Sequence, residues 1–211
     1  MDFTVASYAA WRAEGADGTV AKPDVSFIPP LERRRLTGVE RAALSVAWQV
    51  RPEGEVPVVF ASRWGEIGVT VKLMTQFHAD REMSPAGFSA SVHNAAPGAF
   101  SLLTKNHAPY TAIAARDRSL EAGLLELFAL RQEAIFVYAE EATPEFYLPD
   151  FGMPQPACAV ALRVAESSAS PFSLTFRHAE LPPATFDGFV AFLEGQLPAF
   201  ETTDFAVFRP T

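Results

Sequence analysis

The stretch from Ser84 to Tyr138 constrains the fold more than any other part of this chain. Its apolar spacing predicts a proline-led turn, a helix that opens near Asn94 and a buried strand at Tyr110–Ala115. A sharp turn then leads into a helix over Leu120–Arg131, and a second apolar strand follows at Ala134–Tyr138. A strand that turns abruptly into a helix places the turn residue near unpaired helical N–H groups, where enzymes often hold a nucleophile. The turn in this chain carries no such group.

This stretch resembles the ketosynthases of fatty-acid and polyketide synthesis, in the thiolase-like superfamily. The residues around the turn that carry the resemblance are Pro109, Thr111, the apolar strand 112–115, the turn Arg116–Ser119, and the helix positions Leu120, Ala122 and Leu124. The matching residues outside it are Pro85, Phe88, the run Ser91–Ala96, and Glu140 with Glu141 after the next strand.

In the ketosynthases the turn holds the cysteine that accepts the acyl chain. The resemblance places Arg116 at that position, or Ala115 if the alignment shifts by one residue, and neither side chain forms a thioester. It therefore implies a non-catalytic subunit, a pseudoenzyme similar to the chain-length factors of polyketide and aryl-polyene-type systems. Arg116 is expected either to fill the vacated site beside a carboxylate or to lie in a solvated turn.

The resemblance also implies a heterodimer with an active ketosynthase that elongates fatty-acid or polyketide chains, without a cofactor of its own. The pairing surface in this superfamily corresponds here to Phe88–Phe100 and Pro109–Ala115. A homodimer is the alternative when the chain is alone. The residues expected to face the acyl tunnel or the partner are Phe88, His93, Asn94, Phe100, Arg116 and Asp117.

The alternation of strands and helices predicts the fold class. Strands are expected at Phe3–Trp11 and Val56–Ser62, and Ile67–Ala79 has helical spacing. Thr37 and Glu40 have the spacing of a capping box, which opens a helix that should end near Pro52. This order predicts an α/β, thiolase-like half-fold with a mostly parallel sheet and helices on its faces.

The chain is expected to form one domain of residues 1–211, with a core over 1–156 and a short remnant of a truncated second half over 157–211. In that remnant, Ala157–Val164 is similar to the first strand of a second half. A second strand is predicted at Phe172–Ala179, after a turn at Ser167–Pro171, and a last helix at Phe186–Leu197.

Composition excludes several classes of function. The net charge of −8 opposes a nucleic-acid groove, and it also predicts that an acidic acyl carrier protein is received by the partner. Cys158 is the single cysteine, and we expect it to be a small buried apolar residue. No apolar run reaches the length of a membrane span, so we expect a cytoplasmic protein.

Two alternatives remain open at this stage. One is a small thioesterase-like hydrolase that uses Ser119 or His93, although an N-cap role for the serine and a turn role for the histidine are simpler. The other is a homodimeric, non-enzymatic acyl-binding module. The four histidines lack metal-type spacing, so no metal site is expected. The 18 phenylalanines are many for this length, and an excess can indicate apolar surface that a partner covers.

Overall fold

The computed structural model describes residues 2–14, 20–144, 147, 156–165 and 172–209, and these are organised around one eight-stranded sheet. The strands follow the order β3-β2-β4-β5-β1-β6-β8-β7 across the sheet. The strands are β1 (Asp2–Arg12), β2 (Val58–Ala61), β3 (Tyr110–Ile113), β4 (Ala134–Glu140), β5 (Cys158–Ala165), β6 (Phe172–Phe176), β7 (Ala199–Glu201) and β8 (Phe205–Phe208). The helices are α1 (Pro30–Arg33), α2 (Gly38–Val50), α3 (Ile67–Asp80), α4 (Pro85–Ser89), α5 (Ala95–Thr104), the 3₁₀ turn η1 (Arg116–Arg118), α6 (Ser119–Leu130) and α8 (Phe186–Leu193).

The sheet is mixed, which corrects the prediction of a mostly parallel sheet. Strand β2 runs parallel to β3 and to β4, whereas every other neighbouring pair is antiparallel. Parallel neighbours need a long crossover connection, usually a helix, and here helices α3, α4 and α5 connect β2 to β3, and α6 connects β3 to β4. The α/β half of the prediction is confirmed.

Strand β5 contains most of the run that was predicted to begin a second half. It pairs with β4 from Ala134 to Glu140 on one side and with β1 on the other, so it lies in the middle of the sheet. Its fully apolar inner run reflects this burial on both faces. The strand therefore completes the layer formed by the residues before it. The predicted turn at Ser167–Pro171 lies outside the described residues.

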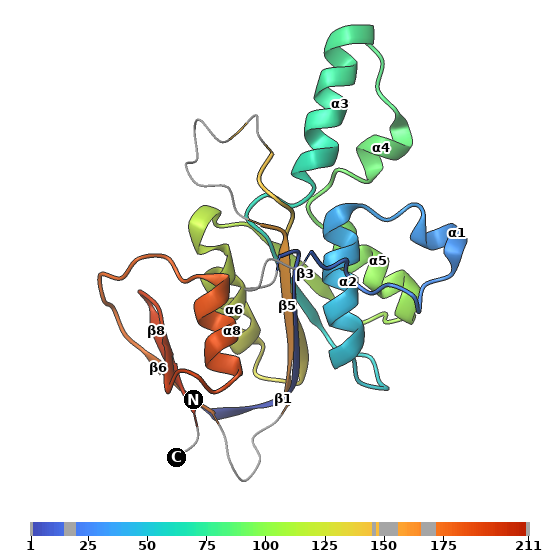
Figure 1. Ribbon diagram of the computed structural model, residues 1–211. Coiled ribbons are helices and arrows are strands. Elements are labelled where there is room, and N and C mark those ends of the chain that lie inside the picture. Colours follow the sequence, from blue (N-terminus) through green and yellow to red (C-terminus); the bar gives the residue numbers. More distant parts are fainter. Residues whose placement is uncertain (1, 15–19, 145–146, 148–155, 166–171, 210–211) are drawn as a thin grey trace.

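Helices cover both faces of the sheet, with α2 and α5 on one face and α6 and α8 on the other (Figure 1). Alternate residues of β2 divide between two apolar clusters: Val58 and Phe60 pack on the α2 side, and Val59 and Ala61 on the α6 side. This is the period-two pattern of a strand that is buried on both faces. The run predicted at Val56–Ser62 is thus confirmed as a central strand.

The predicted capping box at the start of α2 is present. The Thr37 hydroxyl accepts the N–H of Glu40, and the Glu40 carboxylate accepts the N–H of Thr37. The helix ends at Val50, before Pro52 as predicted. Its alanines allow α2 to lie close to β1, β4 and β5.

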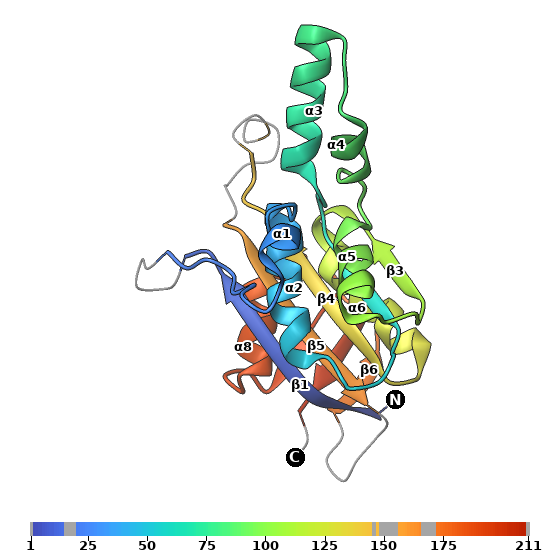
Figure 2. The same cartoon turned by 90° about the vertical axis from the view of Figure 1, so that its right-hand side faces the viewer.

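Helix α3 departs from the predicted layer arrangement. It does not cover the sheet but projects beyond its end, paired with the short helix α4, as two views agree (Figures 1 and 2). Leu73 is the only buried residue of α3, and α4 has none. Helical spacing predicted the helix correctly, but the sheet face it was expected to cover is already occupied by other helices.

The C-terminal region adds a small antiparallel extension to the sheet. Strand β1 pairs with β5 along most of its length and with β6 through Asp2 and Phe3, which joins the extension β6-β8-β7 to the main sheet. The β7–β8 hairpin was not predicted because strands of three and four residues have little periodicity. Its phenylalanines pack with those of α6 and α8 in one aromatic cluster, which includes Phe128, Phe189, Phe192, Phe200 and Phe205.

Candidate functional site

The turn between β3 and α6 has an unusual backbone conformation at Arg116. Its φ is +54°, in the left-handed region that side chains disfavour. The three other non-glycine residues with positive φ in the described ranges, Arg81, Lys105 and Arg131, each terminate a helix, where this conformation is common. Arg116 terminates no helix. The turn therefore holds it in a strained conformation of the kind that is found at functional sites.

Ser119 stabilises this turn from inside. Its hydroxyl accepts the N–H of Ala115 at 2.9 Å and donates to the carbonyl of Arg116 at 2.7 Å. The side chain is 1% exposed. The predicted N-cap role is therefore replaced by a turn-closing role. A hydroxyl with both bonding directions occupied by backbone is poorly placed to act as a nucleophile, which weighs against the hydrolase hypothesis.

A pocket of about 590 Å³ opens at this turn. Its walls come from six parts of the chain: the ends of β1 and β4, the turn after β2, the turn at Arg116, the start of β5, and the segment 183–187. The carboxyl ends of the parallel strands β2, β3 and β4 meet at this edge of the sheet, where ligand sites of α/β proteins usually form. Of the two predicted positions, Arg116 lines the pocket and Ala115 does not.

Glu140 fixes the floor of the pocket. It is 5% exposed, and its carboxylate accepts the Ser62 hydroxyl at 3.0 Å and the N–H groups of Arg63 and Trp64. Burial raises the pKa of Glu140 to about 7, although these hydrogen bonds favour the charged form. Glu140 ends β4, so its carboxylate connects the end of β4 to the residues that follow β2.

The charges around Arg116 favour the solvated turn over the filled site. Asp117 pairs with Arg63 at 2.5 Å rather than with Arg116. Arg116 is exposed, and its guanidinium makes no ion pair within the described part of the chain. It thus lies in an exposed turn at the rim of the pocket, without a carboxylate beside it.

Cys158 faces the same pocket from the start of β5 but is 7% exposed. Burial raises the pKa of its thiol to about 12, and the nearby Glu140 carboxylate acts in the same direction. Such a thiol stays protonated at neutral pH and is a weak nucleophile. Its predicted role as a small buried hydrophobe agrees with this environment.

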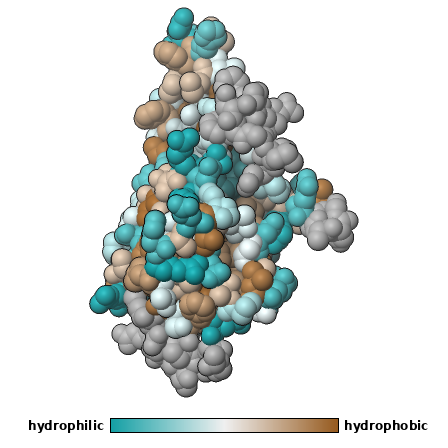
Figure 3. Space-filling view, turned by 90° about the vertical axis from the view of Figure 1, so that its left-hand side faces the viewer, coloured by the Kyte–Doolittle hydropathy of each residue, from teal (hydrophilic) through white to brown (hydrophobic). Residues whose placement is uncertain are grey.

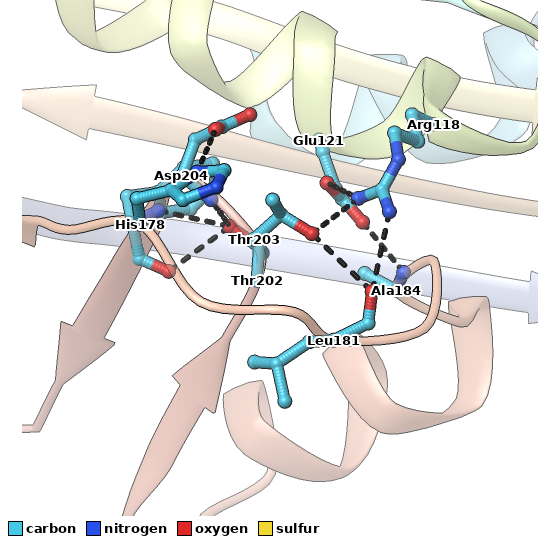
Figure 4. Close-up of polar contacts among 9 residues, drawn as sticks. Arg118, Glu121, His178, Leu181, Ala184, Thr202, Thr203 and Asp204 are labelled. Carbon is cyan, nitrogen blue, oxygen red and sulfur yellow. Dashed lines mark hydrogen bonds and ion pairs between the residues drawn. The ribbon is translucent and has the colours of Figure 1, made fainter.

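A polar network attaches the C-terminal segment to the turn (Figure 4). The Arg118 guanidinium donates to Glu121 at 2.9 Å, to the Thr203 hydroxyl at 2.6 Å and to the Leu181 carbonyl at 3.2 Å. Glu121 is 2% exposed and also accepts the N–H of Ala184 at 2.7 Å. Because 183–187 forms one wall of the pocket, this network fixes that wall relative to Arg116.

The remaining predicted residues lie apart from the pocket. Phe88 is exposed on α4, and Asn94 is exposed at the start of α5, where its side chain makes no cap bond. His93 is half-buried, with its Nε2 3.0 Å from the Ser62 carbonyl oxygen, which agrees with the predicted turn role. Phe100 is 4% exposed and packs in the core against α2, so it does not face a partner.

Strand β3 forms one edge of the sheet, because it pairs only with β2. Its outer residues are open to solvent, and Tyr110 is 39% exposed. An edge strand offers free backbone groups to another chain. The predicted pairing surface therefore contains an edge strand whose outer backbone groups can bind another chain.

Sequence reasoning missed Arg63 and the clamping role of Glu140. The signal was present, since both follow buried strands whose carboxyl ends meet at one edge of the sheet. The sequence could not show that Arg63 and Glu140, which lie 77 positions apart, are hydrogen-bonded. Among the described residues, no three metal-ligating side chains gather at one point, and no helix is long and apolar enough to cross a bilayer.

Comparison with solved structures identifies the fold. A chain from "Ketosynthase (ApeO) in Complex with its Chain Length Factor (ApeC) from Xenorhabdus doucetiae" superposes with a TM-score of 0.79 and 19% identity, over 99% of this chain and 100% of that chain. A chain from the complex of the type II polyketide ketosynthase AntDE with the acyl-carrier protein AntF gives 0.61 and 15%, over 83% and 69%. A β-ketoacyl synthase from Burkholderia phymatum gives 0.53 and 12%, over 85% and 58%.

The sequence comparisons address the family directly. No curated protein matches this chain. The model of the β-ketoacyl synthase N-terminal domain matches residues 8–186, which is most of the chain and includes the turn, the pocket floor and β5. The resemblance stated from the sequence is thereby confirmed, and with it the thiolase-like ketosynthase fold. This chain belongs to the β-ketoacyl synthase family and carries the fold of its N-terminal domain.

Proposed function

We propose that this chain is a non-catalytic, chain-length-factor-like subunit that pairs with an active ketosynthase in fatty-acid or polyketide-type chain elongation. The observation that carries the proposal is the strained turn before α6, which holds Arg116 where the family is expected to hold its acyl-accepting cysteine. Arg116 cannot form a thioester. Cys158, the single cysteine, is buried on β5 with a raised pKa.

The proposed partner surface is the β3 edge together with the segment 88–99 that precedes it. Pairing along β3 would extend the sheet across two subunits through backbone hydrogen bonds. The sequence predicted this surface from the resemblance, and the open edge of β3 supports it. The solved complex of a ketosynthase with its chain length factor has a chain of this fold and supports the same pairing.

In this arrangement the active subunit receives the acyl carrier protein and performs the condensation. The present chain would contribute wall to the acyl tunnel, with the Arg116 pocket beside it. Its net charge of −8 makes direct docking of an acidic carrier protein unfavourable. Residues 172–209 would then act as a short substitute for a second half, held to the turn by the Arg118 network.

The test is to purify the chain alone and together with the ketosynthase encoded nearest to it, and to measure the masses of the species by light scattering. We expect a one-to-one complex that condenses an acyl thioester with a malonyl thioester, with release of CO₂, whereas the lone chain does not. Condensation or thioester hydrolysis by the lone chain would contradict the proposal. A stable homodimer that ignores the ketosynthase would instead support the homodimeric acyl-binding module.

A further inference from the structure

Helices α3 and α4 form a projecting arm, residues 67–89, that is held together by very few buried side chains. Leu73 alone is buried, and it contacts α4 so closely that a Cβ added at Gly87 would lie 2.9 Å from the Leu73 Cδ2. The arm stands clear of the sheet and of the other helices (Figures 1 and 2). Packing within the arm therefore buries only the face of α3 that carries Leu73.

The rest of the arm exposes large apolar side chains. Met74 is 61% exposed, Phe77 45%, Met83 40% and Phe88 60%. Ile67, Val71, Met74 and Phe77 follow helical spacing, so they form one stripe along α3, and Met83 and Phe88 follow further along the arm. Apolar and polar surface alternates along the arm at the top of Figure 3. We call these six residues the arm stripe.

The arm is nevertheless fixed at its root. Glu141 accepts the N–H of Gly68 in the first turn of α3. Glu66, the residue before α3, is 3% exposed, and its carboxyl accepts the Thr37 hydroxyl at 2.9 Å. A stripe on a fixed helix loses little conformational entropy when it is covered. This is the arrangement of a preformed binding element.

We propose that the arm stripe docks on the active ketosynthase subunit and forms a second contact beyond the β3 edge. This inference rests on the proposed function and deepens it. The arm is continuous with the proposed partner surface, since α4 carries Phe88 and leads directly into α5 and then β3. In both views the chain passes from α4 in the arm down into α5 (Figures 1 and 2).

The side chains of the arm stripe indicate what kind of partner surface would bind it. Methionine and phenylalanine side chains fit an apolar groove, and the flexible methionines adapt to irregular surface. The tip carries charges of both signs, at Asp80, Arg81 and Glu82. Binding through the stripe should therefore depend mainly on apolar burial and respond weakly to salt.

The experiment compares two double variants of α3 in binding to the purified ketosynthase. Met74→Glu with Phe77→Glu places two charges in the stripe, whereas Thr75→Glu with Gln76→Glu adds the same charges at exposed positions outside it. We expect the stripe variant to bind at least about 30-fold more weakly, because two anchors of roughly 1 kcal/mol or more are lost. The control should stay within about threefold.

Equal binding by the stripe variant and the control would overturn the inference while leaving the proposed function intact. If the wild-type chain itself forms no complex, the proposed function fails first and the inference falls with it. If the wild-type chain is a dimer, the stripe variant is a monomer and ketosynthase binding is unchanged, then the stripe covers a second copy and the inference is wrong. Phe88→Ser on α4 provides a second variant should the α3 changes reduce solubility.

Discussion

Helices α2 and α3 carry apolar residues at similar helical spacing, yet they lie in opposite environments. Nine of the 13 residues of α2 are buried against the sheet, whereas only Leu73 of the 14 residues of α3 is buried. Both helices begin next to a buried glutamate, Glu40 in the first turn of α2 and Glu66 before α3. The difference shows that an amphipathic pattern specifies a helix with an apolar face. It does not specify whether that face is buried by the same chain or by a partner.

The largest effect should come from truncating the two helices in parallel. Leu44→Ala on α2 removes a side chain that is 2% exposed and should cost about 2–5 kcal/mol of unfolding free energy. For a domain of this size the melting temperature should fall by roughly 5–15 °C. Met74→Ala on α3 should change stability by less than about 0.5 kcal/mol. Thermal melts of both variants measure the contrast, and a large loss for Met74→Ala would show that the arm is covered in the isolated chain.

The next effect concerns the floor of the pocket. Glu140→Gln replaces one carboxylate oxygen with an N–H₂ group, which cannot accept a hydrogen bond, so one oxygen remains for the donors of Ser62, Arg63 and Trp64. We expect a loss of about 2–3 kcal/mol, because buried donors are left without an acceptor. Glu82→Gln at the exposed tip of the arm is the matched control and should melt like the wild type. Chemical denaturation of the pair would show whether the turn depends on Glu140 as the hydrogen bonds indicate.

A third pair compares the packing of α6 with that of α5. A Cβ added at Gly123 on α6 would lie 2.6 Å from Ala61 Cβ and from Phe136 Cε2, so Gly123→Ala should cost about 1–3 kcal/mol. At Gly98 on α5 the nearest atom would be the Tyr110 hydroxyl oxygen at 3.6 Å. Gly98→Ala should therefore be neutral or stabilise by up to about 1 kcal/mol. Similar stabilities for the two variants would mean that α6 lies further from the sheet than the structure shows.

The smallest effect is a dependence on pH at the base of the arm. Burial raises the pKa of Glu66 to about 8, and its Oε2 has no hydrogen-bond partner in the described part of the chain. The folded chain thus keeps a proton that the unfolded chain releases near pH 4.5. Stability should fall as the pH rises from about 5 to 8, since in this window the folded state binds more protons than the unfolded state.

Glu66→Gln should flatten this slope and leave the rest of the pH profile in place. The expected difference across the window is about 1–2 kcal/mol, since each unit of pKa shift is worth about 1.4 kcal/mol. Glu140 contributes a similar slope, which the variant keeps and which cancels in the comparison. Melting temperatures of wild type and variant at pH 5.5, 7 and 8.5 provide the measurement. Parallel profiles would show that Glu66 is charged in the folded protein and that another group reaches its free oxygen.

Local sequence accounted for most individual elements. The capping box of Thr37 and Glu40, the buried run of β2 and the turn before α6 are all present where the residues indicated. Their signals are short-range, since a cap, an apolar run or a breaker acts within a few residues. The β7–β8 hairpin escaped notice because its strands gain their burial from α8 and β6 rather than from their own pattern.

The candidate site was predicted only in part. Arg116 was identified through its place between a strand and a helix, and it lines the pocket. Phe100 was expected to face the acyl tunnel or the partner, and it packs in the core against residues of α2 that come from more than 50 residues earlier in the chain. The ion pair of Asp117 with Arg63 likewise could not be predicted from the sequence around either residue.

The sequence by itself determined which segments are helices and strands, the family to which they belong, and the absence of cysteine at the critical turn. The tertiary structure decided the direction of the strands, the left-handed backbone of Arg116, the clamp made by Glu140, and the exposure of the arm stripe. Propensity, capping and periodicity act between near neighbours along the chain. Pairing, burial and strain depend instead on which distant segments meet, and that is fixed only when the whole sheet has assembled.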